Sequence, residues 1–354
     1  MESGMAGFSD RILEWYAING RKLPWRGNTD PYAVWVSEIM LQQTRVETVI
    51  PYFDRWMKQY PTVWELAASN EQEVLSLWEG LGYYSRARKL FQAAGIVIRD
   101  YRGELPPDLT SLRSLPGIGP YTAGAIASIA FGMDTATLDG NQKRIFARVF
   151  NINESANEPK GEKILWGIAE RTLPKGQAGD YNQALMDLGS MICLPRKPLC
   201  MICPVKKSCQ AQALGLQEQR PVLRSKGTVP HYTVTAAVMK KRGRILLAKR
   251  PAEGLLGGMW EFPGGKVEND EELETCLVRE IREELGVSIH IGEAFGVYRH
   301  AYTHFRITLH AFLCSVKKGE PKPIKATELA WVLPEELGNY PMGKVDRQIA
   351  KQLI

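Results

Sequence analysis

The spacing of apolar residues divides the chain into two parts with different periodicities. Residues 8 to about 212 carry apolar positions at helical spacing and show no strand-like alternation of useful length. Helix start signals support this interpretation, with Asp30-Pro31 before one apolar stretch and Ser69, followed by Glu73, before another. The pattern therefore predicts that this part of the chain is all-helical.

Beyond residue 230 the apolar residues fall into short β-branched and aromatic runs, YTVTAAVM, RILLAKR and FRITLHAFLCSV, which predict strands. One charged helical stretch lies between them, near residues 272–285. Between the two parts, residues 214–230 lose periodicity and gather Pro, Gly and Arg, which is typical of a linker. The sequence thus predicts a multidomain chain, with a helical domain over 1–213, a linker over 214–230 and an α+β domain over 231–354.

Length and composition agree with this division. The chain has 354 residues, more than the roughly 250–300 at which a single core stops growing. Hydrophobic residues at 44% and charged residues at 24% exclude a disordered, collagen-like or disulfide-dense chain. The net charge of +6 suits a polyanionic partner such as nucleic acid without requiring one. No signal peptide and no run of 18 apolar residues is found, so we expect a cytoplasmic protein without membrane contact.

Four of the six cysteines lie close together, at Cys193, Cys200, Cys203 and Cys209. In a reducing compartment, clustered thiols usually bind metal, and four thiolates at this spacing can hold one iron–sulfur cubane or one zinc ion. Residues 193–209 also carry four basic side chains and no acid. This basic loop either contacts phosphates or forms a solvated face.

The string LPGIGPYTA at residues 115–123 predicts a hairpin between two helices. Gly117 and Gly119 allow backbone amides to approach an anion, and the N-terminus of the following helix points the same way. An ordinary helix turn would also use a Gly-x-Gly sequence, so these two glycines alone do not establish phosphate binding.

Two carboxylates stand out in the helical part. Glu38 is the only ionisable side chain between Pro31 and Leu41, apart from Tyr32, so it is either desolvated, with a raised pKa suited to a general acid, or placed at the solvent edge of its helix. Asp139, directly before Gly140, is by itself most simply a helix N-cap. All five histidines lie beyond residue 230, so acid–base chemistry in the helical part falls to carboxylates or tyrosine.

These motifs together resemble a known family. The cysteine spacing and the string LPGIGPYTA resemble the endonuclease III superfamily of DNA glycosylases. The strings LPWR (23–26), SEIMLQQT (37–44) and GLGYYSRAR (80–88) narrow the resemblance, over nearly the whole chain, to the adenine DNA glycosylases of the MutY family. The resemblance implies a [4Fe–4S] cluster on the four cysteines and removal of adenine paired with 8-oxoguanine or guanine in double-stranded DNA, as in base excision repair. It also implies a bacterial, nucleoid-associated location, and we expect a monomer.

The resemblance also implies roles for individual residues. Glu38 protonates adenine N7 and Asp139 stabilises the oxocarbenium-like sugar, with Tyr121 and Asn141 in support. Endonuclease III carries a lysine at the position of Tyr121, and a tyrosine cannot form a Schiff base, so we predict a monofunctional enzyme that leaves an abasic site unless Lys143 traps it.

The resemblance places ten residues at the DNA or its bases. Two of them have an alternative interpretation. Tyr83 could instead be a core residue, and Gln183 could instead occupy a solvated helix position. The segment 299–305, RHAYTHF, is alternatively an exposed hairpin, and its Thr303 stands where the family usually has serine. The ten residues are Arg26, Gln43, Tyr83, Gly117, Gly119, Lys143, Gln183, Tyr302, Thr303 and His304.

The second domain carries a complete Nudix motif from Gly265 to Val287. Glu280, Glu283 and Glu284 fall on one helical face and offer the oxygen ligands that Mg²⁺ takes beside a diphosphate. With eight acids and three bases, the segment 264–287 has a net charge of −5, so it either faces away from DNA or holds metal. The domain is thus either a lesion-reading module that keeps this helix for its fold or an additional hydrolase of oxidised nucleoside triphosphates.

Overall fold

The computed structural model describes residues 7–224, 228–268 and 270–354. Its contacts form two compact units, Met1–Ala67 with Gln92–Lys226, and Ala68–Phe91 with Gly227–Ile354. The predicted linker stays a prediction, and its residues 225–227 lie outside the described residues. Among the described helices, none is long and apolar enough to cross a membrane.

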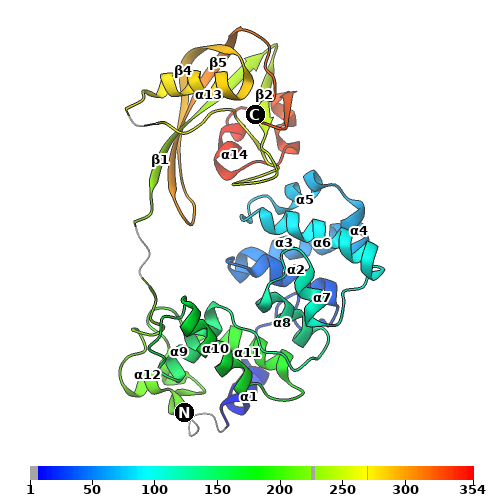
Figure 1. Ribbon diagram of the computed structural model, residues 1–354, viewed down its shortest axis with the longest axis vertical. Coiled ribbons are helices and arrows are strands. Elements are labelled where there is room, and N and C mark those ends of the chain that lie inside the picture. Colours follow the sequence, from blue (N-terminus) through cyan, green and yellow to red (C-terminus); the bar gives the residue numbers. More distant parts are fainter. Residues whose placement is uncertain (1–6, 225–227, 269) are drawn as a thin grey trace. The chain divides into compact units, whose positions relative to one another are not determined.

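The described part of the first unit is helical, as its apolar spacing predicts (Figure 1). α6 (Ser85–Tyr101) runs from the second unit into the first. The other helices of the first unit are α1 (Phe8–Asn19), α2 (Pro31–Leu41), α3 (Val46–Gln59), α4 (Val63–Ala68), α7 (Leu109–Ser114), α8 (Pro120–Ile129), α9 (Gly140–Val149), α10 (Pro159–Arg171), α11 (Ala178–Met191) and α12 (Gln210–Ala213), with the 3₁₀ turns η2 (Cys200–Ile202) and η3 (Lys206–Ser208).

Helix α2 is the most deeply buried of the helices that form the site. The side chain of Asp30 caps it by accepting from the backbone N–H groups of residues 32 and 33, and Pro31 occupies its first position. All nine residues from 32 to 40 are buried, because α2 packs against both α3 and α8. A carboxylate on this helix is therefore removed from water.

An apolar core of this unit joins α1, α9, α10 and α11. Phe8 and Ile12 of α1 pack with Ile145 and Phe146 of α9, and Leu188 of α11 closes the cluster. All five are buried, and Cys193, Cys203 and Cys209 pack against the same core. The cysteine loop is thus attached to the helices that carry Asp139 and its neighbours.

The second unit contains α5 (Glu71–Trp78) and a six-stranded mixed sheet in the order β3-β2-β1-β5-β4, with β6 paired to β2. β1 and β5 are parallel, and the other pairs are antiparallel. Helix α5 is capped by Asn70, one residue after the Ser69 that the sequence suggested. The remaining elements are β1 (His231–Lys241), β2 (Arg244–Lys249), β3 (Trp260–Glu261), α13 (Leu273–Leu285), β4 (Ser288–Ala301), β5 (Arg306–Lys318), β6 (Glu328–Val332), η4 (Pro334–Asn339) and α14 (Lys344–Lys351).

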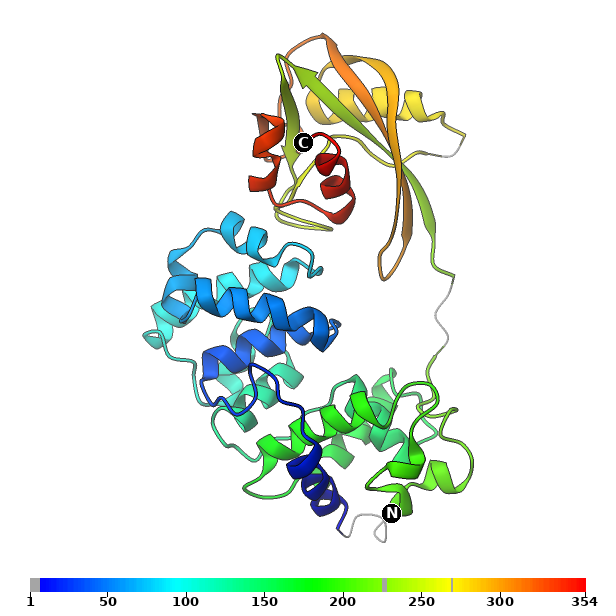
Figure 2. The same cartoon turned by 180° about the vertical axis from the view of Figure 1, so that it is seen from behind.

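Helices cover both faces of this sheet (Figure 1). Along β1, Ala236 and Val238 pack with residues of α14, whereas Ala237 and Met239 pack with residues of α13. Since both faces of β1 are covered, its centre is a continuous buried run without alternation. The long β4–β5 hairpin carries its turn beyond the body of the sheet (Figure 2).

Candidate active site

A cavity of about 800 Å³ opens in the first unit, between the end of α2, the α7–α8 hairpin, the start of α9 and the end of α11. Its volume lies within the range of about 300–1,000 Å³ that is usual for small-molecule sites. Its lining runs from Arg21 to Ser190, so the cavity brings together residues that are up to 169 positions apart. The predicted site residues that line it are Arg26, Glu38, Gln43, Gly117, Gly119, Tyr121, Asp139 and Asn141.

Glu38 and Tyr121 form a buried hydrogen bond at this cavity. Glu38 is 4% exposed, and its Oε2 accepts from the Tyr121 hydroxyl at 2.7 Å. Burial raises the pKa of Glu38, while the Tyr121 hydrogen bond and the charge of Arg26 lower it in part. The net direction is upward, so this carboxyl keeps its proton to a higher pH than a free glutamic acid, as a general acid requires.

Asp139 both caps helix α9 and lines the cavity. Its Oδ1 accepts from the backbone N–H of Gln142 at 2.7 Å, and the Gln142 side chain accepts from the Asp139 N–H at 2.8 Å, which completes a capping box. Oδ2 accepts from Asn141 at 2.9 Å. Burial raises the pKa of Asp139, and these hydrogen bonds together with the nearby Arg144 lower it in part. The cap predicted from sequence is confirmed, and it holds the carboxylate in a fixed orientation.

Arg144 connects Asn141 to the cysteine loop. Its guanidinium donates to Asn141 Oδ1 at 2.8 Å, to the Gly189 carbonyl at 2.7 Å and to the Cys193 carbonyl at 2.7 Å. A Cβ at Gly189 would lie 2.4 Å from the Asn141 Cβ, so this close approach requires glycine. Hydrogen bonds therefore run without a break from the Cys193 carbonyl to the Asp139 carboxylate.

Sequence reasoning missed a buried ion network behind Arg26. Asp187 on α11 has a fully buried side chain and pairs with Arg21 at 2.7 Å and with Arg26 at 3.2 Å. Arg26 also donates to the Tyr16 hydroxyl at 3.1 Å. Asp187 is the only charged residue between Asn182 and Ile192, the same kind of isolation in sequence that marks Glu38.

The helix hairpin forms one wall of the cavity. Gly117 has φ 85°, and Gly119 is the N-cap of α8, whose first residue is Pro120. A Cβ on Gly119 would meet nothing within 4 Å, so the backbone is open on this side. Open amides at a helix N-terminus are suited to an anion.

The cysteine loop surrounds a small cavity. Cys193, Cys200, Cys203 and Cys209 are free thiols and line the same space of about 20 Å³. Arg148, buried below it, donates to Cys193 Sγ at 3.2 Å. Burial raises the pKa of the Cys203 thiol to about 12, so its thiolate form needs a compensating positive charge.

The donor set decides which metal group fits this loop. Four sulfurs without any nitrogen or oxygen ligand match an iron–sulfur cluster or a four-cysteine zinc site. Among the residues that the structure describes, no three His, Cys, Asp or Glu side chains converge on a single ion. Both groups are held by four thiolates, so the donor set alone fits either one.

Comparisons with known proteins show the family of this chain. Residues 36–171 match the HhH-GPD superfamily of base excision DNA repair proteins, and residues 234–352 match the NUDIX domain. The chain is 34% identical to the adenine DNA glycosylase of Homo sapiens, over 94% of this chain and 71% of that protein. It is 38% identical to the adenine DNA glycosylase of Buchnera aphidicola from Acyrthosiphon pisum, over 86% of each. The chain belongs to the adenine DNA glycosylase family.

Adenine DNA glycosylases are base excision repair enzymes that bind damaged double-stranded DNA. The predicted fold, an all-helical HhH-GPD domain followed by an α+β NUDIX domain, is confirmed. A solved thermostable thymine-DNA glycosylase is 32% identical, with a TM-score of 0.56 over 60% of this chain and 98% of that one. A trapped endonuclease III–DNA intermediate, 20% identical with a TM-score of 0.53 over 61% of this chain and 99% of that one, shares the fold. The family that includes endonuclease III typically carries a [4Fe–4S] cluster.

In this adenine DNA glycosylase, two further predicted residues are not among those that line the cavity. Lys143 forms an ion pair with Glu162 at 2.7 Å and does not line the cavity. Gln183 is 9% exposed on α11, which excludes the solvated position, and Met186 and Ser190 of the same segment line the cavity in its place.

Two of the predicted DNA-contacting residues have unusual backbone conformations. Gln43 and Tyr83 have backbone φ angles of 55° and 49°, which residues other than glycine rarely adopt. Tyr83 is 39% exposed, so it is not a core residue. Such strained backbones are frequent at functional sites.

The predicted lesion-reading residues occupy the turn of the β4–β5 hairpin in the second unit. Tyr302 N donates to the Phe305 carbonyl at 2.8 Å, and the rings of His300 and Tyr302 lie 4.6 Å apart. The Thr303 hydroxyl forms a short hydrogen bond with the Tyr83 hydroxyl. A cavity of about 390 Å³ is lined by this turn, by the Tyr83 segment and by residues 254–256.

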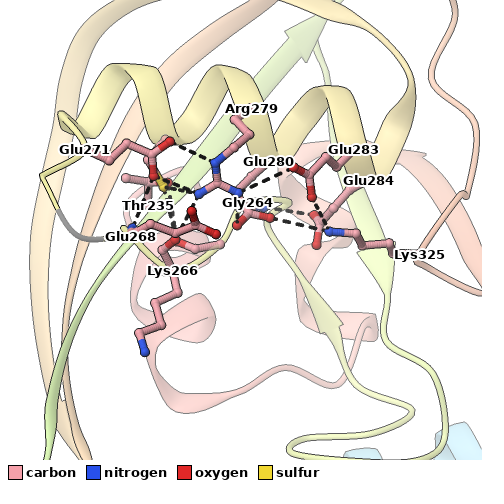
Figure 3. A network of polar contacts seen from close by, with 12 residues as sticks. Thr235, Gly264, Lys266, Glu268, Glu271, Arg279, Glu280, Glu283, Glu284 and Lys325 are labelled. Atoms are coloured by element: carbon pink, nitrogen blue, oxygen red, sulfur yellow. Dashed lines mark hydrogen bonds and ion pairs between the residues drawn. The ribbon is translucent and has the colours of Figure 1, made fainter.

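The NUDIX helix of this glycosylase carries its glutamates in a network of ion pairs (Figure 3). Glu280 pairs with Arg279 at 2.8 Å, and Glu283 pairs with Lys325 at 2.7 Å. Glu284 accepts from the Gly264 N–H at 3.2 Å, and burial raises its pKa to about 7. The three predicted magnesium ligands thus already have protein partners.

Proposed function

We propose that this adenine DNA glycosylase acts on adenine paired with 8-oxoguanine or guanine in double-stranded DNA and is monofunctional. The observation that carries the proposal is one cavity lined by Glu38, Tyr121, Asp139 and Asn141, in which burial raises the pKa of both carboxyls. A flipped adenosine is of a size that fits a cavity of about 800 Å³.

The proposed reaction uses one carboxylic acid and one carboxylate. Glu38, whose pKa is raised by burial, gives its proton to adenine N7, and the N-glycosidic bond breaks with its electrons on the base. Asp139, whose ionised form is favoured by the hydrogen bonds from Gln142 and Asn141, stabilises as a carboxylate the positive charge on the sugar. Water adds to C1′, and its proton returns to the Glu38 carboxylate.

A monofunctional outcome follows from the amines near the cavity. The position that carries a lysine in endonuclease III is Tyr121, whose hydroxyl is committed to Glu38. Lys143 is bound to Glu162 and lies outside the cavity lining. Neither side chain offers an amine to C1′, so the product is an abasic site with an unbroken strand.

The experiment is adenine release from duplexes with adenine opposite 8-oxoguanine, scored for strand breaks with and without alkali. We expect breaks only after alkali in the full-length protein. In Glu38→Gln and Asp139→Asn they should form at least about 100-fold more slowly, while both variants still bind the duplex. Adenine release at the native rate by either variant would overturn the residue assignment, and strand breaks without alkali would overturn the monofunctional one.

We also propose that Cys193, Cys200, Cys203 and Cys209 hold a [4Fe–4S] cluster. Their four sulfurs around one small cavity, over the buried cation of Arg148, support it. When bound, the cluster would cross-link the loop that Arg144 ties to Asn141. The six cysteines are free thiols, which is compatible with a cytoplasmic, nucleoid-associated location, and we propose a monomer, to be checked by light scattering.

We propose that the hairpin turn with Tyr302, Thr303 and His304 reads 8-oxoguanine together with Tyr83. The cavity that the turn and the Tyr83 segment share, and the hydrogen bond between Tyr83 and Thr303, support this role. Thr303→Ala and His304→Ala should each reduce the preference for 8-oxoguanine over guanine opposite adenine, and an unchanged preference in both would overturn the assignment.

A second candidate function rests on the complete NUDIX motif, namely Mg²⁺-dependent hydrolysis of oxidised nucleoside triphosphates at Glu280, Glu283 and Glu284. Release of pyrophosphate from 8-oxo-dGTP by the full-length protein, lost in Glu283→Gln, would support it. An absence of turnover above the buffer rate would leave these residues with the structural role that their ion pairs indicate.

A further inference from the structure

Helix α5 and the loop after it belong to the same compact unit as the C-terminal sheet. Two polar side chains of this segment bind residues of the C-terminal part of the unit, after residue 227. Gln72 donates to the Gly258 carbonyl at 3.0 Å and accepts from the Trp260 indole at 2.9 Å. Glu79, directly after α5, accepts from the Met342 N–H at 3.1 Å and pairs with the Arg347 guanidinium. The segment is therefore held at two places by hydrogen bonds of defined geometry.

The Glu79–Arg347 pair is the stronger of these two attachments. Both carboxylate oxygens of Glu79 accept from Arg347, so the contact is bidentate. The side chains are only 21% and 17% exposed, which reduces screening by water. Arg347 is fixed further by donating to the Leu337 carbonyl at 2.7 Å and to the Tyr340 carbonyl. Lysine at this position would keep the charge but could not form the planar fork.

The residues after Glu79 lead directly to the lesion-reading turn. Gly80 and Gly82 have φ angles of 95° and 76°, which turn the chain sharply over a short distance. The Trp78 indole donates to the Gly82 carbonyl at 3.1 Å and so keeps this turn closed. Tyr83, four residues after Glu79, then forms its hydrogen bond with Thr303. Glu79 is thus the last side chain before Tyr83 for which a hydrogen bond to the C-terminal part of the unit is found.

We infer that the Glu79–Arg347 pair positions Tyr83 against Thr303 and so sets how strongly the enzyme prefers 8-oxoguanine to guanine opposite adenine. Neither side chain of the pair lines the cavity at the turn, so both are positioning residues. The inference rests on the lesion-reading function proposed above. It predicts an effect on the choice of the opposing base and none on the bond-breaking step.

The test measures single-turnover adenine release by the full-length protein on duplexes with 8-oxoguanine or guanine opposite adenine. Glu79→Gln keeps the size and the acceptor oxygen but removes the charge, and Arg347→Met removes the fork. We expect each to lower the ratio of the two rates about tenfold, a change of about 1.4 kcal/mol, with the rate opposite guanine unchanged. Glu328→Gln, which breaks an exposed ion pair with Lys249, is the matched control and should leave the ratio intact.

Further variants separate positioning from a general loss of structure. Arg347→Lys keeps the charge and should give an intermediate ratio with native thermal unfolding. On a Tyr83→Phe background, Glu79→Gln should have no further effect on the ratio, because coupled residues are not additive. An unchanged ratio in Glu79→Gln and Arg347→Lys, or an equal fall of both rates, would overturn the inference.

The same assay distinguishes this inference from the proposal on which it rests. If Thr303→Ala and His304→Ala lower the ratio but Glu79→Gln does not, the positioning role fails and the lesion-reading turn stands. If none of the three lowers the ratio, the lesion-reading function itself fails.

Discussion

The Tyr121 hydroxyl donates to Glu38 Oε2 over 2.7 Å inside the cavity of the first unit. This hydrogen bond favours the ionised carboxylate and therefore lowers the pKa of Glu38, against the larger upward effect of burial. A general acid loses activity as the pH rises through its pKa. In Tyr121→Phe the pKa of Glu38 should rise further, so the alkaline limb of the single-turnover pH profile should move to higher pH.

The control for this prediction is Tyr52→Phe, a tyrosine of the same unit that does not line the cavity. Its pH profile should coincide with that of the native protein. A limb that stays in place in Tyr121→Phe would show that Glu38 is not the titrating acid.

Asp139→Asn should separate capping from catalysis. Asparagine caps helices about as well as aspartate, so the free energy of unfolding should change by less than about 1 kcal/mol. Adenine release should fall by about 10²- to 10³-fold, because the sugar loses its counter-charge. Gln142→Ala breaks the capping box without removing the carboxylate and should do the reverse, with lower stability and much of the activity retained. Urea unfolding and single-turnover rates test both variants.

Gly189→Ala should damage the site from a distance. The new Cβ would stand 2.4 Å from the Asn141 Cβ, so α9 and α11 must separate, at a cost of about 1–3 kcal/mol. Since Asn141 donates to Asp139, adenine release should fall as well. Gly95→Ala is the matched control, because its Cβ meets nothing within 4 Å, and alanine there should stabilise helix α6 by up to about 1 kcal/mol. A Gly189→Ala variant with native stability would contradict the close approach.

Metal analysis tests the cysteine loop. Protein purified without oxygen should contain about four iron and four sulfide ions per chain if a cubane is bound. Cys203→Ser should lose visible absorbance and destabilise the core to which this cysteine is attached. One zinc ion per chain, with no sulfide, would replace the cubane proposal by a structural zinc site.

The second unit should lose stability as the pH rises towards neutrality. Burial raises the pKa of Glu261 and of Glu284 to about 7 and that of Asp346 to about 6. A carboxyl whose pKa is higher in the folded state than in the unfolded state contributes stability at low pH. This contribution is complete below the pKa of the unfolded state, near 4.5 for Glu, and is lost as the pH rises through the folded-state pKa of about 7. The amide hydrogens of β1 and β5 in the full-length protein should therefore lose protection across this window, after correction for the rise of the intrinsic exchange rate with pH. Glu284→Gln should weaken the dependence, whereas Glu328→Gln, at an exposed site, should not.

The helical part and its main site residues were accessible from sequence because their signals are local. Helix α2 begins at an Asp-Pro cap and is apolar throughout, which made Glu38 conspicuous. Strand β1 was found from its continuous apolar run. Strand β4 was missed, because much of it is solvent-exposed and three register shifts against β5 break its alternation.

Long-range contacts were the part that sequence reasoning could not supply. Arg347 and Glu79 are 268 residues apart, and nothing in either local pattern indicates the pairing. The bond from Tyr83 to Thr303 spans 220 residues in the same way. Asp187 is a different case, because it is the only charged residue between Asn182 and Ile192, which is a local signal in the sequence.

The grouping of Ala68–Phe91 with Gly227–Ile354 has a consequence for engineering and for the exchange of modules between relatives. A graft that replaces only the segment after the linker leaves Gln72 and Glu79 facing a foreign surface without Trp260 and Arg347. The transferable unit therefore has three cut points instead of one, at both ends of Ala68–Phe91 and at the linker. Chimeras that carry Ala68–Phe91 and Gly227–Ile354 together should inherit the base preference of the donor. Chimeras that are cut only at the linker should show the base preference of neither parent.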